Sequence, residues 1–421
     1  MTCTSSDFSP GLGNGDHGMT EDFGRFTLPF CSFVAPGEDH PRVGVGVDTD
    51  ILDLTSAAAI VVPEHRELFA AGTLDDFLAA GYEDWQAVRH ALTGWLGPVP
   101  SEERAHEHIV EHHLIPALSV TLRMPFAVSD YVDFYASEEH ATNLGKILRP
   151  GEEPLKPNWK HMPIGYHGRA GTVVVSGTPV IRPQGQHRSP EGEIVFGPTG
   201  RLDIETELGF VVGADSPLGE PVGLADFDRH VFGICLLNDW SARDIQGWEY
   251  APLGPFLGKS FATSISPWIV PLAALSQARI HAPERTTPLL PYLDDATAEP
   301  WGLDLYFEVS LNGNVVSRPP YAGMYWTPAQ MLAHMTVNGA SLHTGDLYAS
   351  GTISGSEDGQ LGSLVEMSWN GEDPLKLDDG STRTFLEDGD TVKISATAAG
   401  PGGETLYLGA VEGTIAPQHS H

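Results

Sequence analysis

Acidic residues alternate with mostly apolar residues over positions 202–210 of the chain. In an extended strand this spacing places Asp203, Glu205 and Glu207 on one face. Neighbouring carboxylates on one face repel one another unless water or a cation compensates their charge. The segment therefore predicts either a solvent-facing acidic face or a site for a metal cation.

The densest group of polar side chains spans positions 238–263. Arg243 and Gln246 are three residues apart, so they share one face of a predicted helix at Ser241–Gln246. Lys259, one of only six lysines, follows in a run rich in Pro and Gly that would hold it on a rigid loop. Together these side chains offer donors for an oxyanion or a carboxylate. A structural Arg–Asp pair with an exposed lysine is the alternative interpretation.

His140 and Glu366 are candidates for proton transfer. Ser137 is a suitable N-cap, which places His140 in the first turn of a predicted helix over Ser137–Leu148. On its own, a histidine near a helix start is more often a hydrogen-bonded structural residue. Glu366 lies in an otherwise apolar segment that we interpret as a strand, and a buried carboxylate needs a partner. A histidine is the usual partner where water must be activated.

A zinc motif is a competing interpretation from another reaction class. His108-Ile-Val-Glu111-His112 matches H-x-x-E-H, which places two histidines on one helical face in zinc peptidases. Pro116 ends any helix four residues later, and no third ligand is marked. We therefore reject a zinc peptidase as the main hypothesis and keep it as an alternative.

The charge balance restricts the partners of this protein. Its 421 residues include 23 Lys and Arg against 56 Asp and Glu, which gives a formal net charge of −33 at pH 7. Nucleic acids and anionic membranes are bound through basic groups, so we predict neither as a partner. The predicted partner is a small molecule. A calcium-binding structural protein is the non-enzymatic alternative, because acidic columns also bind calcium without catalysis.

Cysteine use and the first residues indicate the compartment. Cys3, Cys31 and Cys235 show no CxxC spacing, and Met1–Thr20 has neither the basic nor the apolar region of a signal peptide. Apolar runs are too short to span a bilayer. These features predict a cytoplasmic protein.

Three regions must position the candidate residues. A polar tail over 1–24 precedes a small β domain with two helices over 25–122. Residues 123–421 then form a larger, strand-dominated domain without βαβ alternation, which disfavours a doubly wound sheet. Its clearest strands are Thr172–Ser176, Leu202–Val212, Val231–Leu237, Leu303–Leu311 and Val392–Thr397, and its helices are Ser137–Leu148, Ser241–Gln246 and Thr327–Met335.

Long motifs give the chain a family resemblance. They are Gly165-Tyr-His-Gly-Arg169, Ser176-Gly-Thr-Pro179 and the full run 238–259. From about Phe26 to its C-terminal strands the chain resembles the fumarylacetoacetate hydrolase superfamily. The resemblance implies a β-rich α+β fold with a small N-terminal SH3-like β-barrel domain and helices. A larger C-terminal catalytic domain of mixed β-sandwich/β-roll type would follow, and the protein would be a homodimer.

The resemblance also implies a role for each matching position. The metal carboxylates would be Asp133, Glu205, Glu207 and Asp239, with Lys259 and Thr263 beside a second, smaller cation. His140, oriented by Glu366, would be the general base for water. The groups that stabilise developing negative charge would be Arg243, Gln246 and Lys259. The substrate's carboxylates and carbonyls would contact Tyr135, Arg149, Tyr166, Gln246, Tyr250 and Thr352.

The implied reaction cleaves a carbon–carbon bond in a β-diketone diacid. The product pair would be fumarate and acetoacetate, from the last step of tyrosine and phenylalanine catabolism. Carboxylate ligands without thiolate or imidazole favour a hard cation over zinc. The resemblance favours Ca²⁺ at the carboxylates and Mg²⁺ at the second site, where Ala262 replaces the family's Gly and would crowd the ion. The near alternatives are an acylpyruvate hydrolase and a decarboxylase of the same superfamily.

Overall fold

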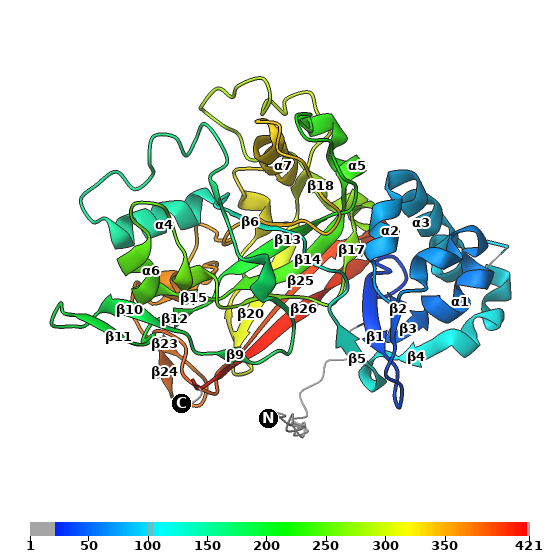
Figure 1. Cartoon of the computed structure of the whole chain (residues 1–421), viewed down its shortest axis with the longest axis horizontal. Coiled ribbons are helices and arrows are strands. Elements are labelled where there is room, and N and C mark those ends of the chain that lie inside the picture. Colours follow the sequence, from blue (N-terminus) through cyan, green and yellow to red (C-terminus); the bar gives the residue numbers. More distant parts are fainter. Residues whose placement is uncertain (1–21, 100, 103, 419–421) are drawn as a thin grey trace, which may run out of the picture.

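The computed structural model describes residues 22–99, 101–102 and 104–418. They form a mixed α+β, sheet-rich fold, with a smaller N-terminal part beside a larger part built on two sheets (Figure 1). The predicted α+β class is confirmed. The predicted tail lies outside the described residues except for its last three positions, and Cys3 lies outside them too. Among the described residues, no helix is long and apolar enough to cross a membrane.

A five-stranded antiparallel sheet forms the smaller part, in the order β4-β3-β2-β1-β5. In that order its strands are Leu114–Pro116, Asp50–Asp53, Pro41–Val47, Phe30–Val34 and Thr121–Arg123. The helices beside it are α1 (Leu54–Val61), α2 (Asp75–Ala80) and α3 (Tyr82–Leu96). Strands β4 and β5 occupy opposite edges of the sheet, and closure into an SH3-like barrel stays a prediction.

An amphipathic pattern explains the position of α3. Trp85, Val88 and Leu92 recur every three or four residues, and all three are buried. The Trp85 ring and the ring of Phe77 from α2 lie 5.5 and 5.3 Å from the ring centroid of Phe232, which belongs to the larger part. The smaller part is therefore anchored to the larger part by an aromatic cluster.

An eight-stranded sheet forms the centre of the larger part, with the path β7-β6-β22-β13-β14-β16-β8 and with β17 also paired to β14. Along that path the strands are Gly165–His167, Tyr131–Phe134, Leu347–Ala349, Thr206–Val212, Val231–Asp239, Thr263–Ile265 and Val173–Val175, and β17 is Val270–Pro271. Strand β14 is buried along its whole length. Leu236 packs in the core of the larger part, whereas Cys235 and Leu237 pack in the core shared with the smaller part.

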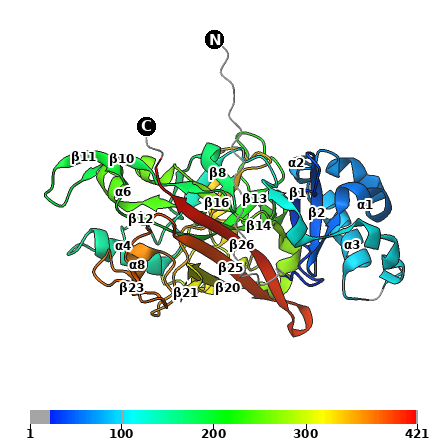
Figure 2. The same cartoon turned by 90° about the horizontal axis from the view of Figure 1, so that it is seen from below.

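A second sheet of five strands crosses beneath the first, and its long strands β25 and β26 are seen clearly in Figure 2. In spatial order it contains β21 (Asn314–Ser317), β20 (Leu305–Leu311), β25 (Thr391–Ala399), β26 (Thr405–Ala416) and β9 (Val180–Ile181). Burial alternates along β20 and β25 as expected for strands with one face on a core. The apolar faces of the two sheets contribute to one large core.

Short strand pairs and helices complete the larger part. The pairs are β10 (Gln184–Arg188) with β11 (Ile194–Pro198), β12 (Leu202–Asp203) with β15 (Ser241–Ala242), β18 (Arg279–Ile280) with β19 (Gly302–Leu303), and β23 (Leu375–Lys376) with β24 (Thr382–Arg383). The helices are α4 (Glu138–Leu148), α5 (Phe227–His230), α6 (Arg243–Glu249), α7 (Pro328–Thr336) and α8 (Leu364–Met367).

Two expected strands take another form. The strand predicted over 202–212 is interrupted between β12 and β13, at Ile204 and Glu205. The strand predicted around Glu366 is wrong, because this residue lies in the short helix α8. The Asp203 carboxylate accepts hydrogen bonds from the first backbone N–H groups of α8, those of Leu364 (2.7 Å) and Val365 (3.1 Å). A short apolar run does not reveal such a tertiary cap.

We predict that Phe232→Ala destabilises the protein by about 3–5 kcal/mol, because Phe232 is only 4% exposed and its removal leaves a cavity between the two parts. Urea unfolding measures the effect. The control is Phe196→Ala on β11, where the ring is 69% exposed, and we expect a change within about 0.5 kcal/mol. Equal unfolding curves for Phe232→Ala and the parent would contradict this prediction.

Candidate active site

A cavity of about 1140 Å³ lies in the larger part, over the ends of several central strands. Its buried end is lined by Asp133, Glu205 and Lys259, and His140 and Arg243 also face it. Exposed residues such as Leu253 line its outer end. The cavity therefore joins the predicted site residues to solvent.

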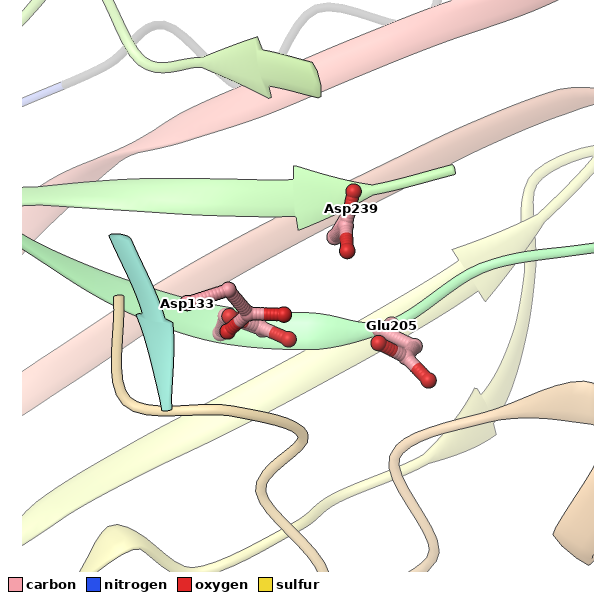
Figure 3. Close-up of side chains that lie close together, drawn as sticks. Asp133, Glu205 and Asp239 are labelled. Carbon is pink, nitrogen blue, oxygen red and sulfur yellow. The ribbon is translucent and has the colours of Figure 1, made fainter. Parts of the chain in front are cut away.

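Four carboxylates gather at the buried end of this cavity. Asp133, Glu205, Glu207 and Asp239 are all buried, and each offers an oxygen within 4.8 Å of the others' oxygens. They come from different elements: β6, the segment between β12 and β13, β13, and the end of β14. Figure 3 shows three of them, Asp133, Glu205 and Asp239, pointing toward one space. The predicted acidic strand face is thus internal, and Asp203 turns away from the cluster to cap α8.

Two buried cations neutralise part of this cluster. Lys259 Nζ bonds to a carboxylate oxygen of Glu205 and lies 2.8 Å from Asp239 Oδ2. Arg243 Nη2 lies 2.7 Å from Glu205 Oε1, and its Nε donates to Asp203 Oδ2 at 2.7 Å. Burial opposes the charged form of Glu205, but the Lys259 and Arg243 charges outweigh it and hold its pKa below the usual range. Burial opposes the charged form of Lys259 as well, and the carboxylates outweigh it and raise its pKa.

The other two carboxylates of the cluster, Asp133 and Glu207, are compensated less completely. Burial raises the pKa of Asp133 and of Glu207, and the charges of neighbouring carboxylates raise both further. Asp133 Oδ1 and Glu207 Oε1 are buried without a hydrogen-bond partner. The cations buried against the carboxylates are Arg243 and Lys259, whereas the buried carboxylates number six: Asp133, Asp203, Glu205, Glu207, Asp239 and Glu366.

That balance leaves a formal excess of four negative charges, and unpaired buried charges are costly. A divalent cation fits this donor set, since it would bind the orphaned oxygens and reduce the excess. The ligand atoms of the cluster are all carboxylate oxygens, which hard cations such as Ca²⁺ and Mg²⁺ prefer.

A histidine–glutamate pair faces the cluster from α4 and α8. The Ser137 hydroxyl accepts from His140 N at 3.2 Å and caps α4, as the sequence predicts. His140 Nδ1 is 2.7 Å from Glu366 Oε2, which leaves Nε2 directed toward Glu205 Oε1 at 3.9 Å. Burial opposes ionisation of Glu366, but His140 and further hydrogen bonds outweigh it and lower its pKa. With Nδ1–H donating to Glu366, Nε2 is free to accept a proton.

Three residues that sequence reasoning missed hold Glu366. Asn143 Nδ2 donates to its Oε1 at 3.0 Å, and the hydroxyls of Ser354 and Ser363 donate to Oε2 at 3.0 and 2.7 Å. Asn143 lies three residues after His140, so one helical face of α4 reaches the same carboxylate twice. That i, i+3 spacing was the available signal.

We predict that Asn143→Ala lowers kcat about tenfold with little change in KM, because loss of a hydrogen bond to a buried carboxylate loosens the His140 orientation. Steady-state kinetics measure both constants. The control is Asn338→Ala, an exposed asparagine outside the cavity lining. A parental kcat in Asn143→Ala would show that Glu366 is held well enough by its two serines.

The other predicted residues either line the same cavity or contact its carboxylate cluster. Arg243 Nη1 donates to Gln246 Oε1 at 3.2 Å, as expected for residues on one helical face. Thr263 Oγ1 donates to Asp239 Oδ1 at 3.2 Å, and Tyr166 OH donates to Asp239 Oδ2 at 3.1 Å. The predicted substrate-contacting residues that line the cavity are Tyr135, Arg149, Tyr166, Gln246, Tyr250 and Thr352.

The alternative zinc motif has a different geometry. His108 lies in one short 3-10 segment (Arg104–Ile109), whereas His112 lies in the next (Glu111–His113), and both residues are exposed. The single helical face that this motif requires is therefore not formed.

Comparisons with known proteins identify the family. The protein-family model described as "Fumarylacetoacetase N-terminal" matches residues 27–125. The family model described as "Fumarylacetoacetate (FAA) hydrolase C-terminal" matches residues 130–415. The chain is a hydrolase of the fumarylacetoacetase family.

Relatives support this membership over nearly the full length. The human fumarylacetoacetase is 42% identical over 407 residues, which cover 94% of this chain and 96% of the relative. The fumarylacetoacetase of Arabidopsis thaliana is 40% identical over 412 residues, which cover 96% of this chain and 97% of the relative. The solved structure of a fumarylacetoacetate hydrolase from Exiguobacterium antarcticum shares the fold, with a TM-score of 0.54 at 17% identity, and covers 93% of this chain and 100% of that chain.

Proposed function

We propose that this protein hydrolyses 4-fumarylacetoacetate to fumarate and acetoacetate, the last step of tyrosine and phenylalanine catabolism. The observation that carries the proposal is the hydrogen-bonded His140–Glu366 pair, whose free Nε2 faces the same cavity as the buried carboxylates. Water activation and charge stabilisation are the two requirements of this reaction, and the site supplies a group for each. The fumarylacetoacetase relatives name the substrate.

His140 and Glu366 would act on water. His140 Nε2 takes a proton from water, whose oxygen then bonds to the carbonyl carbon next to the fumaroyl double bond. Glu366 keeps the proton on Nδ1 and stabilises the imidazolium that forms. The carbon–carbon bond then breaks, and its electron pair leaves on the acetoacetate fragment as an enolate. Protonation of that enolate completes the products.

Donors on α6 and η7 (Leu257–Lys259) would stabilise the negative charge that develops. These donors are Arg243, Gln246 and Lys259. The carboxylate cluster Asp133, Glu205, Glu207 and Asp239 would hold a divalent cation, for which we propose Ca²⁺. When bound, such an ion acts as a Lewis acid on carbonyl and enolate oxygens. A second, smaller cation, Mg²⁺, would lie near Asp239, Lys259 and Thr263, next to the Ala262 methyl.

Polar atoms without partners mark where the substrate would bind. Arg149 Nε and Thr352 Oγ1 are buried beside the cavity and lack hydrogen-bond partners. A guanidinium suits a carboxylate and a hydroxyl suits a carbonyl, so we assign them to the two kinds of oxygen on a diketone diacid. The phenols of Tyr135, Tyr166 and Tyr250 line the same space.

We further propose the assembly and the domain division that the sequence suggested. The protein would be a cytoplasmic homodimer. Residues 25–122 would form the N-terminal domain, and residues 123–421 the catalytic domain, with a boundary near β5.

A turnover assay tests the proposed function. Purified protein is mixed with fumarylacetoacetate, and fumarate and acetoacetate are quantified as equimolar products. An acylpyruvate and a β-keto acid serve as comparison substrates for the hydrolase and decarboxylase alternatives. Faster release of pyruvate or of CO₂ than of fumarate would refute the proposal.

A further inference from the structure

Two arginines at the outer end of the cavity lack an acidic partner. Arg188 ends β10, and Arg201 lies between β11 and β12; both are exposed and both line the cavity. Within the described part of the chain, neither guanidinium has a carboxylate within 4.0 Å. By contrast, Arg182, which lies between β9 and β10, pairs with Asp388 at 2.6 Å, so its charge is compensated.

Uncharged groups hold both guanidiniums in place. The Arg188 guanidinium carbon lies 4.5 Å from the ring centroid of Trp248, another cavity-lining residue. Arg201 Nη1 donates to Asn370 Oδ1 at 2.9 Å, and its guanidinium carbon lies 5.7 Å from the Phe385 ring centroid. These contacts position the two cations without cancelling their charges.

Such a pair is unexpected in a chain with 56 acidic and 23 basic residues, where a basic side chain readily finds a carboxylate. One acid, Asp244, does line the cavity near these arginines. Its carboxylate oxygens accept hydrogen bonds from Thr199 Oγ1, Gly200 N (2.9 Å) and Ile245 N (2.9 Å). The outer wall therefore keeps two positive charges free to meet an incoming anion.

We propose that Arg188 and Arg201 form a cationic entrance that draws dianionic substrates to the cavity and selects them over monoanions. This inference rests on the proposed function, which requires a dicarboxylate to approach a chain with a formal net charge of −33. The screening length is about 8 Å at physiological salt, so local charges at the opening dominate over the distant acidic surface. The entrance therefore acts on substrate capture, which is distinct from the chemical step at His140.

The test compares Arg188→Gln, Arg201→Gln and the double variant with the parent. At an ionic strength of about 0.01 M, where charges act over about 30 Å, we expect KM for fumarylacetoacetate to rise about threefold per substitution. The difference should shrink at about 0.15 M, and the preference for this dianion over a monoanionic acylpyruvate should fall in the double variant. Arg188→Lys keeps the charge and should stay close to the parent.

Arg123→Gln on β5 is the matched control, because it removes one exposed arginine outside the cavity lining. It should leave KM and its salt dependence unchanged. If the double variant keeps the parental KM and its salt dependence, the proposed cationic entrance is wrong, even when the parent hydrolyses fumarylacetoacetate. If the parent does not turn over fumarylacetoacetate, the proposed function fails, and the entrance is then tested by calorimetry with fumarate as a dianionic probe. Weaker fumarate binding in the double variant supports the entrance, and equal or absent binding overturns it.

Discussion

Replacing His140 by alanine is expected to lower kcat by about 10²–10⁴-fold, the usual contribution of a positioned general base. His140 is 2% exposed and bonds Glu366, so its imidazole has a fixed direction toward the cavity. Alanine removes the Nε2 that accepts the proton from water, while the carboxylate cluster keeps its ligand atoms. The measurement is steady-state kinetics on fumarylacetoacetate, combined with metal analysis of the purified variant.

His161→Ala serves as the control because His161 is exposed and does not line the cavity. It should retain the parental kcat. Glu366→Gln keeps the shape of the partner and removes its charge, so it should fall between His140→Ala and the parent. A His140→Ala variant with parental turnover would exclude this histidine as the base.

Removing divalent cations is expected to lower turnover about 10³-fold and to lower the melting temperature by several degrees. At the site, six buried carboxylates surround only two buried cations, Arg243 and Lys259. A divalent ion that binds this arrangement in the folded state and not in the unfolded chain therefore stabilises the protein. Lewis-acid stabilisation of several kcal/mol corresponds to about 10³-fold in rate. Chelation followed by dialysis, and then separate addition of Ca²⁺ or Mg²⁺, measures both effects.

Glu207→Gln sharpens this prediction at one ligand. Glu207 Oε2 accepts from Gly351 N at 3.2 Å, whereas Oε1 has no partner, so the amide keeps the fold and weakens the ion site. We expect a higher cation concentration for half-maximal activity. Glu308→Gln, on the second sheet and outside the cavity lining, is the matched control. Full activity in metal-free protein would refute the role of the cluster.

The sequence predicted which side chains lie together better than it predicted the elements that carry them. Alternation at Glu205 and Glu207 indicated a cation site, and both belong to the carboxylate cluster. The same pattern assigned Asp203 to that face, yet its carboxylate caps α8 at Leu364, which is 161 positions further along the chain. Local periodicity carries no information on such long-range contacts. For the same reason the segment around Glu366 was predicted as a strand although it forms the helix α8.

Local signals sufficed where the stabilising contact is itself local. The Ser137 side chain caps α4 by accepting a hydrogen bond from the backbone N–H of His140, three residues later. Thr327 caps α7 through a capping box, in which Thr327 and Gln330 each bond the other's backbone N–H through a side chain. Ser354 and Ser363 escaped prediction because their importance comes from the carboxylate they meet, which only the folded chain brings to them.

The position of strand β14 between two cores has a consequence for inherited or engineered variants of this chain. One side of the strand packs with the N-terminal sheet and the other with the second sheet, and the strand ends at Asp239 in the carboxylate cluster. A packing defect on either side therefore destabilises the same strand and lowers the fraction of folded protein. Most harmful substitutions far from the cavity should reduce the amount of active enzyme in the cell and leave each surviving molecule fully competent.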